Sequence, residues 1–218
     1  MVSRRHRPWP NDTASTCARR FALGFAIALI LLLSLPLGSA RADPTATPVA
    51  PAPEECTVHP LTAASLRRLA ATPDDDRQLV TPPLTDQAPA DAAITETVTD
   101  TIREAIACAN ANQPLRSLAL FTDRFLQWRF GPDHRDDLES LIAASTRSPA
   151  PAADADRLVL IAVSDLRLLP DGRVSAVVIT ENAERRFEDL LILDQVDGRW
   201  LIDEWSALAD ADPATPSP

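Results

Sequence analysis

The segment 123–130, with the sequence DRFLQWRF, contains the residues whose types and spacing best suit recognition of an anion. Arg124 and Arg129 can donate bidentate hydrogen bonds to an anionic group, and Trp128 offers an aromatic face for a cation–π contact. The alternative is that this segment is the amphipathic end of a core helix, with its aromatic residues buried. We favour the core interpretation, and we retain Trp128 and Arg129 as candidate ligand-binding residues.

Patterns that would indicate a metal site or a phosphate-binding loop are missing from the sequence. No pair of histidines or cysteines has the spacing of zinc ligands. The acidic stretches DDDR (74–77) and DADR (154–157) lack the glycine and the terminal glutamate of a calcium-binding EF-hand loop. The chain contains five glycines and no GxGxxG, Walker or GxSxG pattern. We therefore predict no metal ion and no cofactor.

The first 42 residues have the pattern of a secretory signal peptide. A basic segment precedes an apolar run at 21–33, and Ala40 and Ala42 flank Arg41 at the expected cleavage position. We predict cleavage after Ala42 and export to the extracellular space or the cell envelope. The alternative is a single uncleaved membrane anchor, because an apolar stretch of roughly 17 residues is about the shortest that can span a bilayer.

The predicted mature chain is strongly acidic. The whole chain has 21 basic side chains, all of them arginine, and 31 acidic ones. Without residues 1–42, 15 arginines remain against 30 acidic side chains, which gives a net charge of −15. Such a surface repels the phosphate backbone of nucleic acids. We therefore expect the partner to be a small molecule or an envelope protein, or a second copy of the chain bound through a sheet face.

Two of the three cysteines, Cys56 and Cys108, lie in the predicted mature chain. A single pair of cysteines in an oxidising compartment most simply forms a disulfide. The bridge would close a loop of roughly 50 residues and would stabilise the fold by about 4 kcal/mol, if the stabilisation comes from chain entropy. The alternative is a pair of buried free thiols.

Composition divides the predicted mature chain into folded and extended parts. Residues 43–54 are rich in Pro, Ala and Thr and are expected to form a spacer, and residues 207–218 are expected to form a disordered tail. Residues 55–91 are predicted to contain a helical extension and a proline-rich loop. Residues 92–206 are predicted to form the main domain.

The first half of the folded part has the apolar spacing of helices. Apolar residues within 61–69 predict a short helix. A clear apolar stripe over 94–106 predicts a long helix that carries Cys108 in its last turn and ends at Asn110.

Two further helices are predicted before the strands begin. Pro114 suits the first position of a helix, and a second apolar stripe continues from it through Leu126 until Gly131 interrupts the pattern. Asp133 is the expected cap of the helix that follows.

The second half of the folded part has the pattern of an antiparallel sheet. The dipeptides Asp171-Gly172 and Asp197-Gly198 are typical of two-residue hairpin loops. Several strands are apolar on both faces, so one face should pack on the helices and the other needs a further cover. The fold class is therefore predicted to be α+β, with the helices packed on a curved four-stranded meander. The predicted strands are 157–169, 173–180, 186–196 and 199–205.

The stretch TIREAIACANANQPLRSLALFTDRFL (101–126), the meander and its closing strand GRWLIDEW (198–205) resemble the nuclear transport factor 2-like superfamily, which includes SnoaL-like cyclases and ketosteroid isomerase. The resemblance covers residues 92–206. It implies a cone-shaped α+β roll in which a curved sheet wraps around helices and leaves a pocket at its open end. One departure is that residues 127–135 leave little room for the hairpin that the family usually has there.

The resemblance also implies where chemistry would be found. Enzymes like ketosteroid isomerase use a carboxylate base and a donor, often Tyr, that holds an enolate oxygen. This sequence has no Tyr. The Asp–His pairing of related dehydratases would here require Asp123 and His134, which lie on separate predicted helices. A lone histidine after the start of a helix is more often a surface residue than a base.

The sequence therefore favours an exported, non-catalytic domain that binds a small ligand or an envelope protein. The alternatives are an isomerase- or cyclase-type enzyme of the SnoaL-like class, and a membrane-tethered accessory or sensor domain. The candidate ligand-binding residues are Asp123, Trp128, Arg129, His134 and Trp200.

Overall fold

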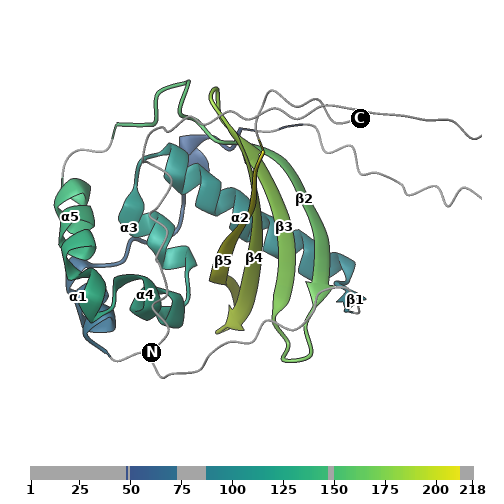
Figure 1. The fold of residues 1–218 in the computed structure, drawn as a ribbon, viewed down its shortest axis with the longest axis horizontal. Helices are drawn as coiled ribbons and strands as arrows, with labels where there is room; N and C mark the ends of the chain where they lie inside the picture. Colours follow the sequence, from purple (N-terminus) through teal and green to yellow (C-terminus); the bar gives the residue numbers. More distant parts are fainter. Residues whose placement is uncertain (1–47, 49, 73–86, 147–149, 212–218) are drawn as a thin grey trace, which may run out of the picture. The chain divides into compact units, whose positions relative to one another are not determined.

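A computed structural model describes residues 48, 50–72, 87–146 and 150–211, all within one compact unit, Pro44–Pro218. In this part of the chain, helices come first and an antiparallel sheet follows, so the predicted α+β class is confirmed (Figure 1). The predicted leader, 1–42, lies outside the described residues. Among the helices that are described, none is both long and apolar enough to cross a membrane.

The first two predicted helices are present near their predicted positions. Helix α1 (Ala63–Ala71) follows Thr62, whose Oγ1 accepts a hydrogen bond from the backbone N–H of Ser65. Helix α2 (Ala92–Asn110) begins after Asp91, whose side chain accepts a hydrogen bond from a backbone N–H of the first turn. The long helix ends where the sequence predicts, with Cys108 in its last turn.

The helix predicted from Pro114 onward is not continuous. It is divided into α3 (Pro114–Ser117), the 3-10 turn η3 (Leu118–Leu120) and α4 (Asp123–Phe130). The prediction of one helix is wrong because Phe121 is extended and forms a parallel bridge with Ile202. Helix α4 then starts afresh from Thr122, whose Oγ1 accepts the N–H of Phe125.

The last helix also begins differently from the prediction. A 3-10 turn, η4 (Pro132–His134), precedes α5 (Arg135–Ser145), so Asp133 lies within the turn rather than at the cap position. The N-cap residue of α5 is His134, and its side chain makes no capping hydrogen bond.

The four predicted strands are present in the described residues, and the sheet contains a fifth. The short strand β1 pairs Ala88 with Leu168 and Pro89 with Arg167. The prediction of four strands is wrong because β1 is only two residues long and lies in a proline-rich stretch. Two residues are too few to show the alternation of apolar and polar side chains that predicts a strand. The order is β1-β2-β3-β4-β5, with antiparallel neighbours: β1 (Ala88–Pro89), β2 (Val159–Leu168), β3 (Val174–Glu181), β4 (Arg186–Val196) and β5 (Arg199–Ala211).

The two Asp-Gly dipeptides form turns of different length. Asp197 and Gly198 both have positive φ angles, 51° and 79°, as a two-residue type I′ turn requires. The loop at Asp171-Gly172 is three residues long. It is closed by a hydrogen bond from the backbone N–H of Leu169 to the carbonyl oxygen of Arg173, so Pro170 is also part of the loop. A two-residue loop would require Pro170 to pair with Arg173. Proline has no N–H group to donate to the neighbouring strand, so the last pair is Leu169 with Arg173.

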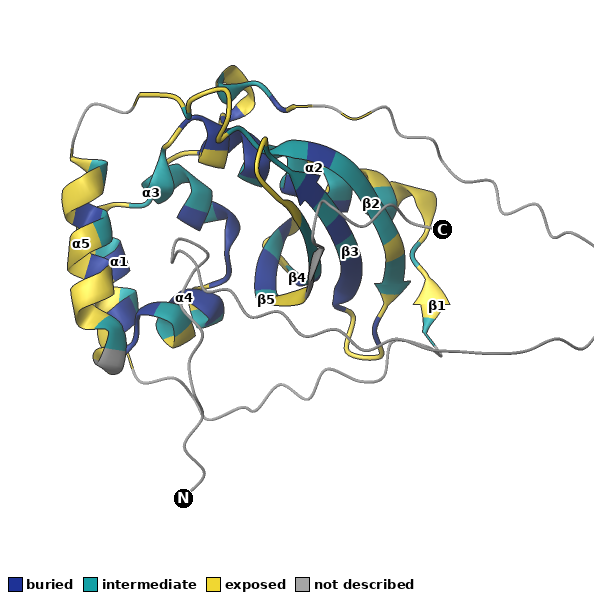
Figure 2. Ribbon diagram, turned by 45° about the horizontal axis from the view of Figure 1, so that its top comes forward, coloured by how far each residue is buried: buried dark blue, intermediate teal, exposed yellow. Residues whose placement is uncertain are grey.

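Helix α2 crosses one face of the sheet, and the main core lies between them (Figure 1). Val98 and Ile102 of α2 belong to the same buried cluster as alternate residues of β3 and as Trp200 and Ile202 of β5. Figure 2 shows buried positions gathered on α2 and the central strands, whereas α5 has a largely exposed outer side. Helix α1 contacts α4 and α5, so the N-terminal extension is part of the helical layer.

The segment before α1 is fixed to the end of α2. The predicted disulfide between Cys56 and Cys108 is confirmed. Glu55, in the 3-10 turn η1 (Pro53–Glu55), forms an ion pair with Arg103 at 2.9 Å. The predicted spacer and tail are therefore shorter than their composition indicates: ordered structure begins before residue 55, and β5 extends past 206 to Ala211.

A buried asparagine joins three parts of the chain. The side chain of Asn110 is 1% exposed, and its Nδ2 donates hydrogen bonds to the carbonyl oxygens of Pro51 at 3.1 Å and Leu158 at 3.0 Å. Its Oδ1 accepts the backbone N–H of Leu158 at 2.9 Å. Asn110 therefore ties the N-terminal segment and the start of β2 to α2.

Replacing Asn110 with alanine is expected to lower the free energy of unfolding by about 2 kcal/mol, because buried backbone groups lose their partners. Chemical denaturation followed by circular dichroism measures this change. Gln113→Ala is the control, since the Gln113 side chain makes no hydrogen bond to the described residues, and it should change stability by less than about 0.5 kcal/mol. Equal stability of the two variants would contradict the assigned role.

Candidate functional site

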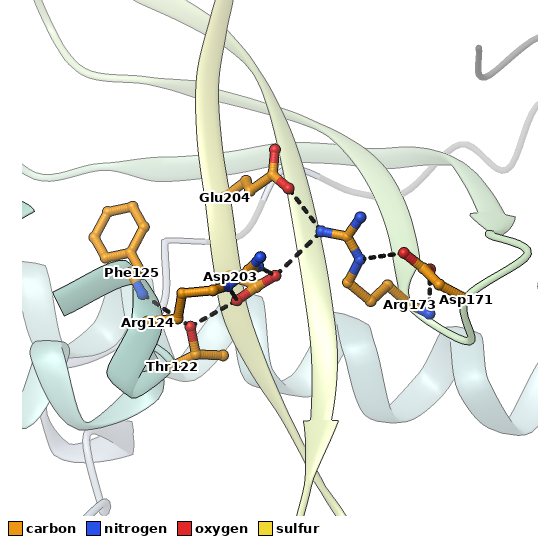
Figure 3. Close-up of polar contacts among 7 residues, drawn as sticks. All are labelled: Thr122, Arg124, Phe125, Asp171, Arg173, Asp203 and Glu204. Atoms are coloured by element: carbon orange, nitrogen blue, oxygen red, sulfur yellow. Dashed lines mark hydrogen bonds and ion pairs between the residues drawn. The ribbon is translucent and has the colours of Figure 1, made fainter. Parts of the chain in front are cut away.

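Six polar and charged side chains, three of them buried, are joined by hydrogen bonds and ion pairs in a set that we call the ion cluster: Thr122, Arg124, Asp171, Arg173, Asp203 and Glu204. Asp203 lies at its centre and is 3% exposed. Its Oδ1 accepts hydrogen bonds from Thr122 Oγ1 at 2.7 Å and from Arg124 Nε at 3.0 Å. Figure 3 shows Thr122 and Arg124 on one side of Asp203 and Arg173 on the other.

Arg173 connects this carboxylate to the hairpin between β2 and β3. Its Nη1 donates to Asp203 Oδ2 at 3.2 Å and to Glu204 Oε1 at 2.6 Å. Its Nε donates to Asp171 Oδ2 at 2.8 Å. Since Arg124 also forms an ion pair with Asp203 Oδ2, the cluster joins the start of α4, the edge strand β5 and the β2–β3 loop.

A bulge in β5 positions Asp203. Leu193 pairs with Ile202 and Ile192 pairs with Glu204, so Asp203 is an extra residue between two paired positions. A bulge of this kind re-aims a side chain relative to the regular alternation of a strand. Sequence reasoning missed Asp203 because no residue type in GRWLIDEW marks the bulge.

Ion pairing within the cluster shifts two pKa values. Burial opposes the charge of Arg173, but hydrogen bonds to Glu204 and Asp171 outweigh it and raise the pKa of the guanidinium. Burial also opposes ionisation of Asp171, but the backbone N–H and the side chain of Arg173 donate hydrogen bonds that hold the pKa of Asp171 below its ordinary value. Both shifts favour the ionised pair.

The Asp171 shift predicts an acid-dependent loss of stability. Because its pKa is lower in the folded than in the unfolded protein, Asp171 stabilises the fold above pH about 4 and loses this contribution as the pH falls through the folded pKa. Thermal melts between pH 7 and pH 3 should therefore show a smaller acid-induced fall in Tm for Asp171→Asn than for the wild type. An identical fall in both proteins would contradict the role of Asp171.

The geometry of Asp203 suits an anchor rather than a general base. A general base needs a free lone pair within hydrogen-bond reach of the substrate. Both oxygens of Asp203 are already engaged, by Thr122 and by two guanidinium groups. The arrangement therefore fixes α4 against β5.

The predicted ligand-binding residues are distributed over different environments. Asp123 is exposed at the first position of α4 and forms no ion pair with His134. Arg129 and His134 both contact Asp137, at 3.2 Å and 3.8 Å, so these two side chains do come together. Trp200, in contrast, is 7% exposed and belongs to the core cluster.

Trp128 is 53% exposed, whereas the favoured interpretation of its segment placed it in the core. Its ring lies 5.6 Å from that of Phe125, which lies 4.6 Å from Phe121, and Phe121 stacks on Trp205 at 6.2 Å. The helical stripe correctly predicted burial of Phe125. It failed for Trp128 because the two central rings of this row, Phe121 and Phe125, are buried in the core, whereas Trp128 and Trp205 at its ends are exposed.

A groove of about 250 Å³ lies between α1 and the connection from α4 to α5. Its floor is formed by buried apolar side chains, among them Phe130 and Leu138, which are 3% and 2% exposed. Gly131 forms part of the wall, and a Cβ atom there would lie 2.8 Å from the carbonyl oxygen of Gln127, so the position must lack a side chain. The residues that line the groove are Arg67, Ala70, Ala71, Phe130, Gly131, Pro132, Arg135, Leu138 and Glu139.

The rim of the groove carries three charged groups. Arg67 donates two hydrogen bonds to Glu139, from Nε to Oε1 at 2.8 Å and from Nη2 to Oε2 at 2.6 Å. These bonds hold the pKa of Glu139 below its ordinary value. Arg135 is exposed and makes no hydrogen bond or ion pair with any residue that the structure describes. The charge of Arg135 also acts on Glu139 and contributes to lowering its pKa. With two arginines and one glutamate, the rim carries a net charge of +1.

In the described ranges, no three His, Cys, Asp or Glu side chains are grouped closely enough to hold a metal ion. Comparison with known proteins gives no further assignment, because the chain matches no family model, no curated protein and no solved structure.

Proposed function

We propose that this chain is an exported, non-catalytic domain that binds a small ligand in the groove between α1 and the α4–α5 connection. The observation that carries the proposal is the groove itself, which combines a buried apolar floor with a charged rim. Ligand sites in proteins are typically concave and mostly apolar, with a few polar groups that fix the orientation of the ligand.

The space beneath the sheet is a weaker candidate. Val98 and Ile102 of α2 pack there with Leu193, Trp200 and Ile202 in one buried cluster. Close packing of large apolar side chains leaves little room for a ligand. The engaged state of Asp203 further supports a binding role over an isomerase or cyclase role, because the buried carboxylate has no oxygen to offer as a base.

Two further parts of the proposal concern family and location. We propose that the domain is related to the nuclear transport factor 2-like, SnoaL-like proteins, and the helix α2 lying across an antiparallel sheet supports this (Figure 1). Export is supported by the disulfide between Cys56 and Cys108, since disulfides persist mainly in oxidising compartments. Recovery of an intact N-terminus in a membrane fraction would favour the tethered alternative.

A fragment screen by NMR tests the proposed site, with protein purified from cells that express the full chain. Fragments should shift the amide signals of Ala70, Gly131 and Leu138. Ala71→Trp, which fills the groove from an exposed position, should abolish these shifts without lowering Tm. Shifts confined to Trp200 and Ile202 would instead place the ligand beneath the sheet and contradict the proposal, and turnover of a fragment would favour the enzyme alternative.

A further inference from the structure

We propose that the ligand of the groove is a small monocarboxylate with one ring or one short branched apolar group, and that Arg135 binds its carboxylate. This inference rests on the proposed function, because it assigns the ligand class to the same groove. Two properties of the groove carry it: the size and polarity of the floor, and the charge of the rim.

The floor sets the size and polarity of the ligand. A volume of about 250 Å³ is below the roughly 300–1,000 Å³ typical of sites for drug-sized molecules. The buried rings and methyl groups of Phe130, Leu138 and Ala70 offer no hydrogen-bonding partner at the base of the groove. The inserted part of the ligand is therefore a single compact apolar group.

The rim sets the charge of the ligand. Arg67 is engaged by Glu139 through two hydrogen bonds, so these two groups largely cancel each other. Arg135 lines the same groove and makes no hydrogen bond or direct ion pair with the described residues, although its charge also acts on Glu139. Its N–H donors are therefore not engaged by any described residue. A guanidinium group binds a carboxylate with two parallel hydrogen bonds, which makes a carboxylate the complementary head group.

The overall charge of the protein does not prevent this binding. The predicted mature chain has a net charge of −15, which repels anions at long range. Salt screens charges over about 8 Å at physiological ionic strength, so the groups that line the groove dominate the local field. Those groups are Arg67, Arg135 and Glu139, with a net charge of +1.

Titration with benzoate and with benzyl alcohol, followed by NMR shifts of groove residues, tests the inference. Benzoate should bind the wild type, and Arg135→Gln should weaken its binding about five- to tenfold while leaving benzyl alcohol binding unchanged. Arg68→Gln is the matched control: it removes the same charge from an exposed position on α1 that does not line the groove, and it should leave benzoate binding unchanged.

The possible failures are distinguishable. If benzyl alcohol binds in the groove as tightly as benzoate, or if Arg135→Gln binds benzoate like the wild type, the carboxylate assignment is overturned and the groove remains the ligand site. If neither compound nor any other fragment shifts groove signals, the proposed function fails together with this inference. A loss of benzoate binding in Arg68→Gln equal to that in Arg135→Gln would show a general charge effect and would also overturn the assignment.

Discussion

Replacing Asp203 with alanine is expected to lower the free energy of unfolding by about 3 kcal/mol. The change removes the carboxylate that Thr122, Arg124 and Arg173 share, and it leaves the guanidinium of Arg173 buried with fewer partners. Breaking a buried ion pair by removing one partner is strongly destabilising, because the remaining charge stays out of water. We place the effect at the low end of the usual range, since Arg124 is partly exposed and Arg173 retains Asp171 and Glu204.

Urea denaturation of the wild type and of matched variants measures this effect. Asp100→Ala removes an exposed carboxylate from α2 and should change stability by less than about 0.5 kcal/mol. A double-mutant cycle with Arg124→Ala should give a clearly non-zero coupling energy, because the two residues are in contact. A loss below about 1 kcal/mol in Asp203→Ala would mean that the ion cluster does not hold α4 against the sheet.

Loss of the disulfide should have a similarly large effect. The double variant Cys56→Ala/Cys108→Ala is expected to lose about 4 kcal/mol of stability, because 52 positions separate the two cysteines and the unfolded chain gains the entropy of an open loop. Both cysteines are buried, at 4% and 0% exposure, and they pack in a second apolar cluster with Val58, Ala107, Ala111 and Leu120. The alanine pair therefore also leaves a small packing defect.

Reduction of the wild type separates these two contributions. Wild-type protein that is unfolded in the presence of a strong reductant lacks the disulfide but retains both cysteine side chains, so it has no packing defect. Its midpoint in urea should fall nearly as far as that of the double alanine variant. If both samples unfold at the same urea concentration as the oxidised wild type, the bridge contributes nothing to stability and the loop entropy argument fails.

Much of the fold follows from local sequence patterns. The stripe over 94–106 predicted α2 because a repeat near 3.6 residues suits one buried helix face. The strands β2 to β5 followed from β-branched runs and turn dipeptides, and Asp197-Gly198 predicted its turn because both residues tolerate positive φ. Each of these signals lies within a few consecutive residues.

The features that the sequence did not reveal depend on distant contacts. The break before α4 arises because Phe121 pairs with Ile202, which lies 81 positions further along the chain. Asn110 looked like a helix end, and its clamp on Pro51 and Leu158 requires both segments to reach it. The candidate site was hardly predictable: of the segment 123–130 only Phe130 lines the groove, and none of the predicted ligand-binding residues does. Arg135 joins the groove only through the packing of α1 on α5.

The position of β5 as the last described strand has a consequence for biogenesis. A growing chain that has emerged only as far as β4 has neither Ile202 to bridge Phe121 nor Asp203 to accept hydrogen bonds from Arg124 and Arg173. Helix α4 then lacks these contacts with the sheet, and apolar surface on Phe121 and Phe125 stays exposed until β5 has been made. Completion of the core of this domain therefore requires β5, the last strand that the structure describes.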